Sequence, residues 1–337
     1  MSGSDGQEIT ADKAHPVIPS SRHPVIPSSS AGLLHYRPWR GEFRPPFVSA
    51  WPIARIALRM MFRRKLYWAM YALGLMMFLL FFFGQYLLAW AETQGGETSV
   101  PVMGLREDPK KIVHILRTIL KLNGTGETYG NFFWYQGYLV MVVLALAGSL
   151  LVGNDIHYGS LPFYLSKPLS SWHYLLGKAL AVGVFINLMT TLPAVVLWVQ
   201  YGLLDSWDYF LDNWHLLAGI LGYGLVLTVC LSLLLVATAS WLRRTVPMIM
   251  AWTTLFLFCR LLAGALVDRL HFDPRWRLLD LWNDTYLVGN ILLSIAPDEI
   301  RPAPQPDWYL GALVLGGVCI LCLSYLILRI RAVEIVR

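Results

Sequence analysis

Long apolar blocks separated by short polar segments run through most of this chain. Six of these blocks reach the length of about 20 residues that a helix needs to cross roughly 30 Å of hydrocarbon. They occupy residues 66–91, 132–153, 179–204, 216–242, 246–267 and 308–330. Backbone groups in lipid must find hydrogen-bond partners within their own segment, so such blocks form helices rather than strands. The pattern predicts an all-α polytopic membrane protein with six transmembrane helices.

Three further segments differ from this pattern. Residues 286–296 are apolar but too short to span, which predicts a re-entrant or interfacial piece. Residues 48–65 place Arg55, Arg59 and Arg63 four residues apart, with Ile53, Ile56, Ala57, Met60 and Met61 on the other face. This spacing predicts an amphipathic, basic interfacial helix before the first span. Residues 1–47 are rich in Pro and Ser and repeat the heptapeptide HPVIPSS, which predicts a disordered tail.

Basic residues gather before the first block, between the fourth and fifth blocks, and at the end of the chain. They are Arg55, Arg59, Arg63, Arg64, Lys65, Arg243, Arg244, Arg329, Arg331 and Arg337. Because Lys and Arg near span ends are retained in the cytoplasm, and because six is an even number, both termini are expected to be cytoplasmic.

Composition agrees with a membrane protein. Of 337 residues, 56% are hydrophobic and 14% are charged, against about 25% charged in soluble domains. The net charge of +6 is explained by basic residues beside anionic membrane lipids, so no nucleic-acid partner is expected. All four cysteines fall within the apolar blocks, which does not indicate a disulfide framework.

Motifs for catalysis and nucleotide binding are missing from the sequence. It contains no GxxxxGK[ST], HExxH or GxSxG, so we predict no catalytic residues, no enzyme activity and no cofactor bound by this chain. Cys319 and Cys322 have metal-ligand spacing, but they lie in an apolar helix without His or acid. We therefore favour the interpretation of both as small hydrophobic residues over a metal site.

A few polar residues interrupt the predicted spans. Gln85, Gln136 and Asn187 are interpreted as interhelical hydrogen-bonding groups, with the lining of a transport pathway as the alternative. Arg260 lies about 14 residues, or ~21 Å, from the inner end of its helix. We favour snorkelling to the headgroups or pairing with Asp268 over contact with a substrate.

The stretch HYGSLPFYLSKPLSSWHYLLGK, residues 157–178, separates the second and third spans on the predicted cytoplasmic side. Its Gly and Pro residues predict a short helix of about two turns held across the ends of two spans. The pattern of an acid, then Gly-Ser-Leu, Leu-Ser-x-Pro and Tyr-x-Leu-Gly-Lys resembles the permease subunits of ABC-2 type transporters, in particular the six-span branch with the nitrous-oxide-reductase maturation permease. The family often has Arg after the Ser that follows the Pro, whereas this chain has Ser171 and then Trp172.

The resemblance implies an ATPase-coupling role for one set of residues. These are Asp155, Gly159, Ser160, Leu161, Phe163, Tyr164, Leu165, Pro168, Gly177 and Lys178. It also implies a permease that pairs with a second copy or a homologue and binds two separate ATPase subunits, which hold ATP and Mg²⁺. Such proteins reside in the bacterial cytoplasmic (inner) membrane, and we expect an exporter. The alternative is a membrane anchor or assembly factor that docks a cytoplasmic partner without transport.

Overall fold

The computed structural model describes residues 48, 50–93, 100–102, 105–107, 117–118, 121–153, 171–242, 244–296 and 299–335. Within these ranges, six helices are long and apolar enough to cross a membrane. They confirm the prediction of a helical fold with six helices of span length and point to a multi-pass membrane protein, with one short pair of strands that the sequence did not predict. The predicted tail, residues 1–47, lies outside the described residues.

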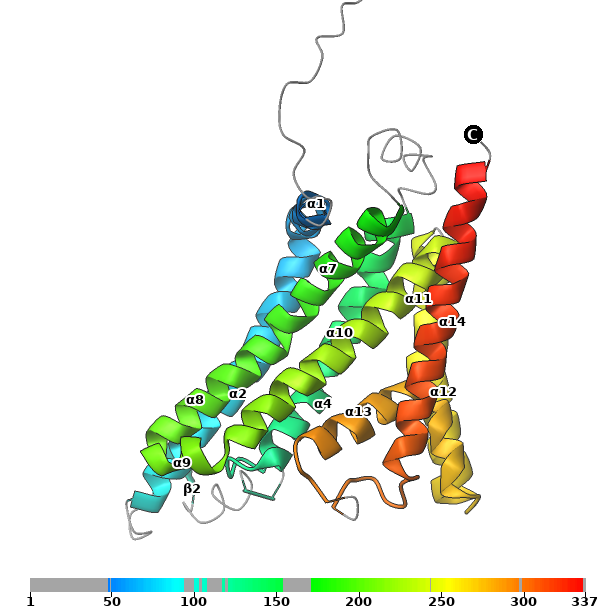
Figure 1. The fold of residues 1–337 in the computed structure, drawn as a ribbon. Coiled ribbons are helices and arrows are strands. Elements are labelled where there is room, and N and C mark those ends of the chain that lie inside the picture. The colour runs from blue at the N-terminus through cyan, green and yellow to red at the C-terminus, as the bar shows by residue number, and fades with distance from the viewer. Residues whose placement is uncertain are drawn as a thin grey trace, which may run out of the picture. The chain divides into compact units, whose positions relative to one another are not determined.

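The spans run alternately in opposite directions (Figure 1). They are α2 (Lys65–Thr93), α4 (Gly126–Gly148) continued by η3 (Ser149–Gly153), α7 (Ser171–Met189) with α8 (Thr191–Leu204), α10 (Trp214–Leu242), the series α11 (Thr245–Thr253), η4 (Thr254–Phe258), α12 (Cys259–Gly264) and η5 (Ala265–Arg269), and α14 (Trp308–Ile335). Short elements complete the described fold. They are α1 (Ala50–Phe62), strands β1 (Val100–Val102) and β2 (Leu105–Glu107), which pair antiparallel, α9 (Trp207–Asp212), the 3-10 helix η6 (Pro274–Leu279) and α13 (Leu281–Leu292).

Two spans begin earlier than the hydrophobic pattern predicts. Helix α4 begins at Gly126 rather than near residue 132, because its first turn is held by a polar contact that hydropathy does not report. Thr128 is fully buried, and its Oγ1 donates to the carbonyl of Lys121. The third span extends from Trp172 to Leu204. It is interrupted at Thr190, three residues before Pro193, whose missing N–H breaks the regular helical hydrogen bonding.

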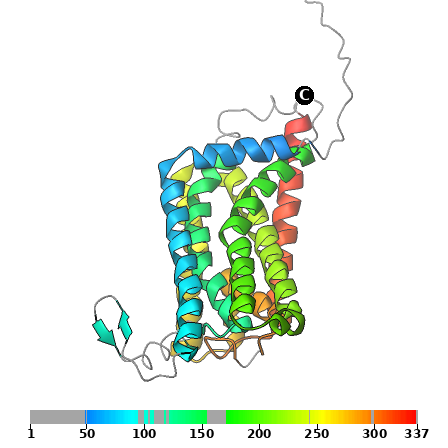
Figure 2. The same ribbon diagram turned by 90° about the vertical axis from the view of Figure 1, so that its left-hand side faces the viewer.

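Helix α1 crosses the end of the bundle at which η3 ends and α7 begins (Figure 2). Its buried side consists of Ala50, Ile53, Ala54, Ala57 and Met61. Arg55 and Arg59 are exposed, as the spacing predicts, and Arg63 follows in the turn after the helix. The predicted apolar face needs one correction. Ile56 is 54% exposed, because it lies beside the arginines on the face turned away from the spans.

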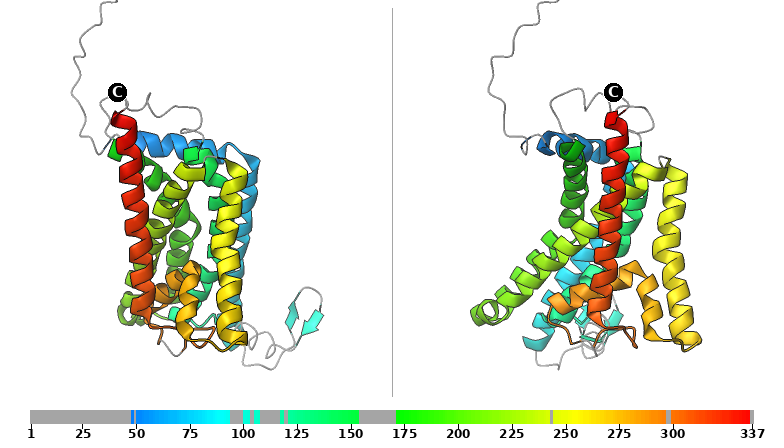
Figure 3. Two further views of the ribbon diagram at one scale, coloured as in Figure 1. Left: turned by 90° about the vertical axis from the view of Figure 1, so that its right-hand side faces the viewer. Right: turned by 45° about the vertical axis from the view of Figure 1, so that its right-hand side comes forward.

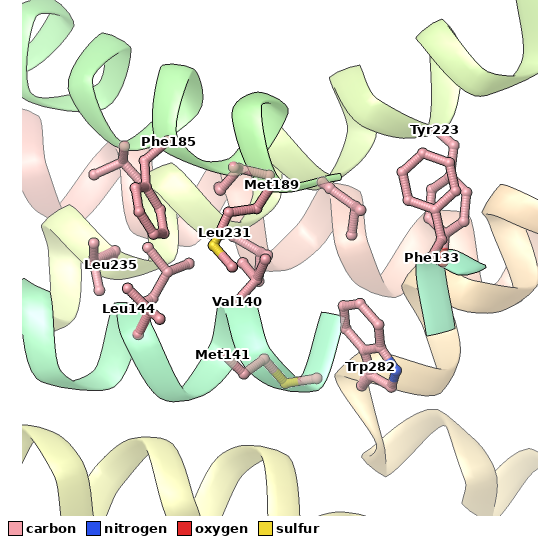
Figure 4. Close-up of a cluster of buried hydrophobic side chains, with 14 of the residues drawn as sticks. Phe133, Val140, Met141, Leu144, Phe185, Met189, Tyr223, Leu231, Leu235 and Trp282 are labelled. Atoms are coloured by element: carbon pink, nitrogen blue, oxygen red, sulfur yellow. The ribbon is translucent and has the colours of Figure 1, made fainter. Parts of the chain in front are cut away.

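The core lies between α4, α7 and α10. Figure 4 shows its centre, where Leu144, Phe185 and Leu235 lie at one side and Phe133 and Tyr223 at the other, all five without exposure to solvent. Small residues allow the helices this close approach, as is usual in membrane bundles.

Helix α13 contains most of the short apolar piece, residues 286–296, that the sequence placed between the fifth and sixth spans, but it begins five residues earlier, at Leu281, and ends at Leu292. It is not long enough to be a span, and it enters the bundle from the end opposite to α1 (Figure 3). Its Trp282 is fully buried against α4 at Gly137, where an added Cβ would lie 2.0 Å from the indole ring. This contact fixes α13, and with it the polar residues at its first turn.

Candidate functional site

Most of the predicted ATPase-coupling residues fall in the segment between Gly153 and Ser171. Asp155, Gly159, Ser160, Leu161, Phe163, Tyr164, Leu165 and Pro168 lie outside the described residues. Gly177 and Lys178 lie in α7, two turns after its beginning.

Gly177 is the point at which α1 contacts α7. A Cβ added there would lie 2.7 Å from Cβ of Ile53 and 2.9 Å from the carbonyl oxygen of Ala50. Only a residue without a side chain permits this approach, so Gly177 joins the helix before the first span to the beginning of the third.

Lys178 is 1% exposed. Its ammonium donates to the carbonyl of Leu151 in η3 and lies 5.5 Å from the ring centroid of Tyr174. The lysine therefore ties the end of the second span to the beginning of the third and does not present its charge on the surface of this chain.

The amide side chains predicted within the spans have different environments. Asn187 donates from Nδ2 to Oγ1 of Thr228 over 2.7 Å, which links α7 to α10 as an interhelical hydrogen bond. Gln85 and Gln136 are each 1% exposed. Both amide atoms of Gln85 and Oε1 of Gln136 are buried without a hydrogen-bond partner among the described residues.

Arg260 has aromatic neighbours that the sequence did not indicate. Its guanidinium lies over two aromatic rings of α4, 4.5 Å from the centroid of Trp134 and 5.1 Å from that of Tyr138. Such cation–π contacts stabilise an arginine by about 0.5–2 kcal/mol, more where water is excluded. Its Nη1 is buried without a hydrogen-bond partner among the described residues.

The expected pairing of Arg260 with Asp268 does not form, because Asp268 forms a salt bridge with another arginine. Arg277 of η6 forms a salt bridge with Asp268 and donates from Nε to the carbonyl of Pro304 over 2.7 Å. The turn after η5 brings Arg277 close to Asp268, and its guanidinium is almost completely buried.

A cavity of about 460 Å³ opens beside Arg260. We call it the Arg260 cavity, and it lies between α4, η6, the first turn of α13 and the half of the fifth span that is farther from α1. Its lining is Trp134, Arg260, Leu261, Ala263, Gly264, Ala265, Asp268, Arg269, Arg277, Asp280, Asn283 and Pro302. The wall is closed on the loop side by Asn283, whose amide exchanges two hydrogen bonds with Gln305.

Two buried carboxyl groups stand at the beginning of α13. Asp280 caps the helix by accepting a hydrogen bond from the backbone N–H of Trp282 over 3.0 Å. Burial raises the pKa of Asp280, although the positive charge of Arg260 acts in the opposite direction. One turn later, burial and the charge of Asp280 raise the pKa of Asp284 to about 9. Asp284 is therefore a neutral acid at pH 7.

Sequence reasoning missed this acidic pair. The hydrophobic pattern predicted one long outer loop over residues 268–307, and it did not indicate that Asp280 and Asp284 are buried. The available signal was local. DLWND begins with an N-cap residue and repeats an acid at i and i+4, which places both carboxyls on one helix face.

Two of the four cysteines are neighbours in the bundle. Sγ of Cys319 lies 3.5 Å from Sγ of Cys230 on α10, and the two pack as neighbouring helix side chains. Among the residues that the structure describes, no three His, Cys, Asp or Glu side chains are grouped so that they could hold a metal ion.

Comparison with known proteins adds no family to these observations. No protein-family model matches the chain, and no curated protein matches it either.

Proposed function

We propose that this chain is the membrane-spanning permease subunit of an ABC-2 type, ATP-driven exporter. The observation that supports this most directly is the position of Gly177 and Lys178, the described part of the ABC-2-like motif. Through Ile53 and Leu151 they connect α7 to α1 and to η3. A force applied to the segment between Gly153 and Ser171 would therefore move three elements together.

The end of the bundle that carries α1 is assigned to the cytoplasm. Span directions place there the basic residues Arg55, Arg59, Arg63, Arg64, Lys65, Arg244, Arg329 and Arg331. Glu334 is the one Asp or Glu among the described residues of this end, whereas acids outnumber bases at the opposite end. This asymmetry supports cytoplasmic N- and C-termini by the positive-inside rule.

Helix α1 is proposed to lie in the headgroup region of the inner leaflet. Its exposed side carries Arg55 and Arg59 beside Trp51 and Ile56, both more than half exposed. Basic and apolar side chains on one exposed face suit a helix in contact with anionic headgroups and acyl chains at once.

In this proposal the chemistry of ATP belongs to partners. Two ATPase subunits hold ATP and Mg²⁺, and each docks on residues 155–168 of one permease copy. Their closure displaces that segment, tilts α1, α7 and η3 together and changes access to the space between two permease copies. The expected location is the cytoplasmic membrane of a bacterium.

Co-purification tests the docking. If the adjacent reading frame encodes a P-loop ATPase, as this proposal expects, the chain is expressed with that ATPase and purified by an affinity tag. We expect the ATPase to co-purify and to hydrolyse ATP in nanodiscs. Changing Leu161, Phe163 and Leu165 together to Asp removes three apolar side chains worth about 1.5–3 kcal/mol each, or about 4.5 kcal/mol or more together. Association is expected to fall about a thousandfold or more, so that the ATPase no longer co-purifies.

Leu211→Asp is the matched control. Leu211 is 67% exposed on α9, at the opposite end of the bundle, so the same chemical change there leaves association unchanged. If the wild-type chain does not bind the ATPase, the proposal is wrong. Binding without ATP-dependent movement of any substrate identifies the alternative, a membrane anchor.

A further inference from the structure

The Arg260 cavity has more positive than negative charge. Three arginines line it, Arg260, Arg269 and Arg277, against two aspartates, Asp268 and Asp280. Asp284 lies behind Asp280 and is neutral at pH 7, since burial raises its pKa to about 9. The lining residues that the structure describes therefore carry one surplus positive charge.

Because Arg277 is paired with Asp268, the surplus belongs to Arg260 and the exposed Arg269 together, against one remaining carboxylate, Asp280. The Arg277 guanidinium is bound to Asp268 and to the carbonyl of Pro304, whereas no acceptor among the described residues bonds Nη1 of Arg260. The rings of Trp134 and Tyr138 hold the guanidinium in place from one side. A fixed, incompletely bonded arginine is suited to bind an anion with little loss of side-chain entropy.

The surface beside the cavity is apolar. Leu257, Phe258 and Leu261 are each more than half exposed on the same span, and Leu261 also lines the cavity. These side chains face the hydrocarbon of the membrane if the span is embedded. A ligand whose anionic group binds at Arg260 can thus place an apolar tail along the helix, whereas a free inorganic anion would make no contact with this apolar surface.

We propose that the Arg260 cavity binds the phosphodiester headgroup of an acidic phospholipid. The phosphate accepts hydrogen bonds from the Arg260 guanidinium and neutralises the surplus charge. The acyl chains lie along Leu257, Phe258 and Leu261. The site requires only this chain, so it stands or fails independently of the proposed ATPase partners.

The test counts bound lipid on the purified chain. Wild-type protein in nanodiscs of mixed phosphatidylglycerol and phosphatidylcholine is released for native mass spectrometry, and we expect retained phosphatidylglycerol in preference to phosphatidylcholine. Arg260→Gln keeps a polar side chain but removes the charge. It lowers this retention roughly tenfold or more, the loss expected for one charge-assisted hydrogen bond.

Two further variants make the result specific. Gly264→Leu fills the cavity while every charge remains, since a Cβ at Gly264 meets only Oδ2 of Asp268 at 3.6 Å. It is expected to lower retention as well, and it decides the question alone if Arg260→Gln does not fold. Arg275→Gln removes an exposed arginine of η6 that does not line the cavity, so it retains lipid as the wild type does.

Three results would overturn the proposal. The first is equal retention of phosphatidylglycerol and phosphatidylcholine by the wild type. The second is unchanged retention in folded Gly264→Leu and Arg260→Gln proteins. The third is displacement of phosphatidylglycerol by sodium phosphate at matched concentration, which would identify a site for the free anion instead of a lipid.

Discussion

Replacing Asp284 by asparagine tests whether the first turn of α13 contains a neutral carboxylic acid. Asp284 has no exposed surface, and both of its carboxyl oxygens lack a hydrogen-bond partner among the described residues. Helix α14 covers it at Gly311, where an added Cβ would lie 3.6 Å from Oδ1. Asparagine has nearly the shape of the protonated acid, so it fits this site without a charge.

The magnitude follows from the pKa of Asp284, raised by burial from its ordinary 3.8 to about 9. Between these two values the folded chain keeps a proton that the unfolded chain releases, so stability falls as pH rises. At about 1.4 kcal/mol per pH unit, the loss at pH 7 is about 4 kcal/mol, and it reaches about 7 kcal/mol at pH 9. Asp284→Asn removes this loss.

Thermal unfolding in detergent, followed by tryptophan fluorescence at pH 5, 7 and 9, is the assay. We expect the variant to unfold at higher temperature than the wild type, by a margin that increases with pH. Asp212→Asn, an exposed position on α9, controls for loss of one negative charge and gives no pH-dependent margin. A margin that is constant over this range, or a variant less stable than the wild type at pH 7, would refute the reasoning.

Two further predictions concern packing within the bundle. Gly137→Ala places a methyl group 2.0 Å from the Trp282 ring, and because overpacking of a core costs about 1–3 kcal/mol, the melting temperature falls. Gly316→Ala is the control, since nothing lies within 4 Å of the added Cβ, and it does not lower the melting temperature. Asn187→Leu removes the hydrogen bond to Thr228 between α7 and α10. Stability is expected to fall by about 0.6 kcal/mol, the average for such bonds in membrane proteins. A loss several times larger would show that Asn187 stabilises the bundle through interactions besides this hydrogen bond.

The number and approximate limits of the spans could be predicted because each span is specified by residues that are contiguous in the sequence. A helix in lipid satisfies its own backbone, so a contiguous apolar block is sufficient to specify it. The limits were wrong only where polar residues belong to the helix. The first turn of α4 contains Glu127 and Thr128, and Thr128 is buried by its bond to Lys121.

The candidate site was predicted only in part. Arg260 was identified because a charge within an apolar block is visible in the sequence, but the pairing predicted for it was wrong. Snorkelling or pairing with Asp268 was favoured over contact with a substrate. In the tertiary structure Asp268 instead forms a salt bridge with Arg277. Arg260 stacks on Trp134 and Tyr138, which lie more than 120 positions earlier in the chain.

The sequence by itself determined that the chain has six apolar helices, a basic helix before the first of them and a short apolar piece before the last, since these depend on hydrophobic periodicity within single segments. The tertiary structure alone decided that Lys178 and Asp284 are buried and that a cavity forms beside Arg260. Burial and charge at these positions depend on contacts between segments distant in sequence, and local pattern carries no information on which helices become neighbours.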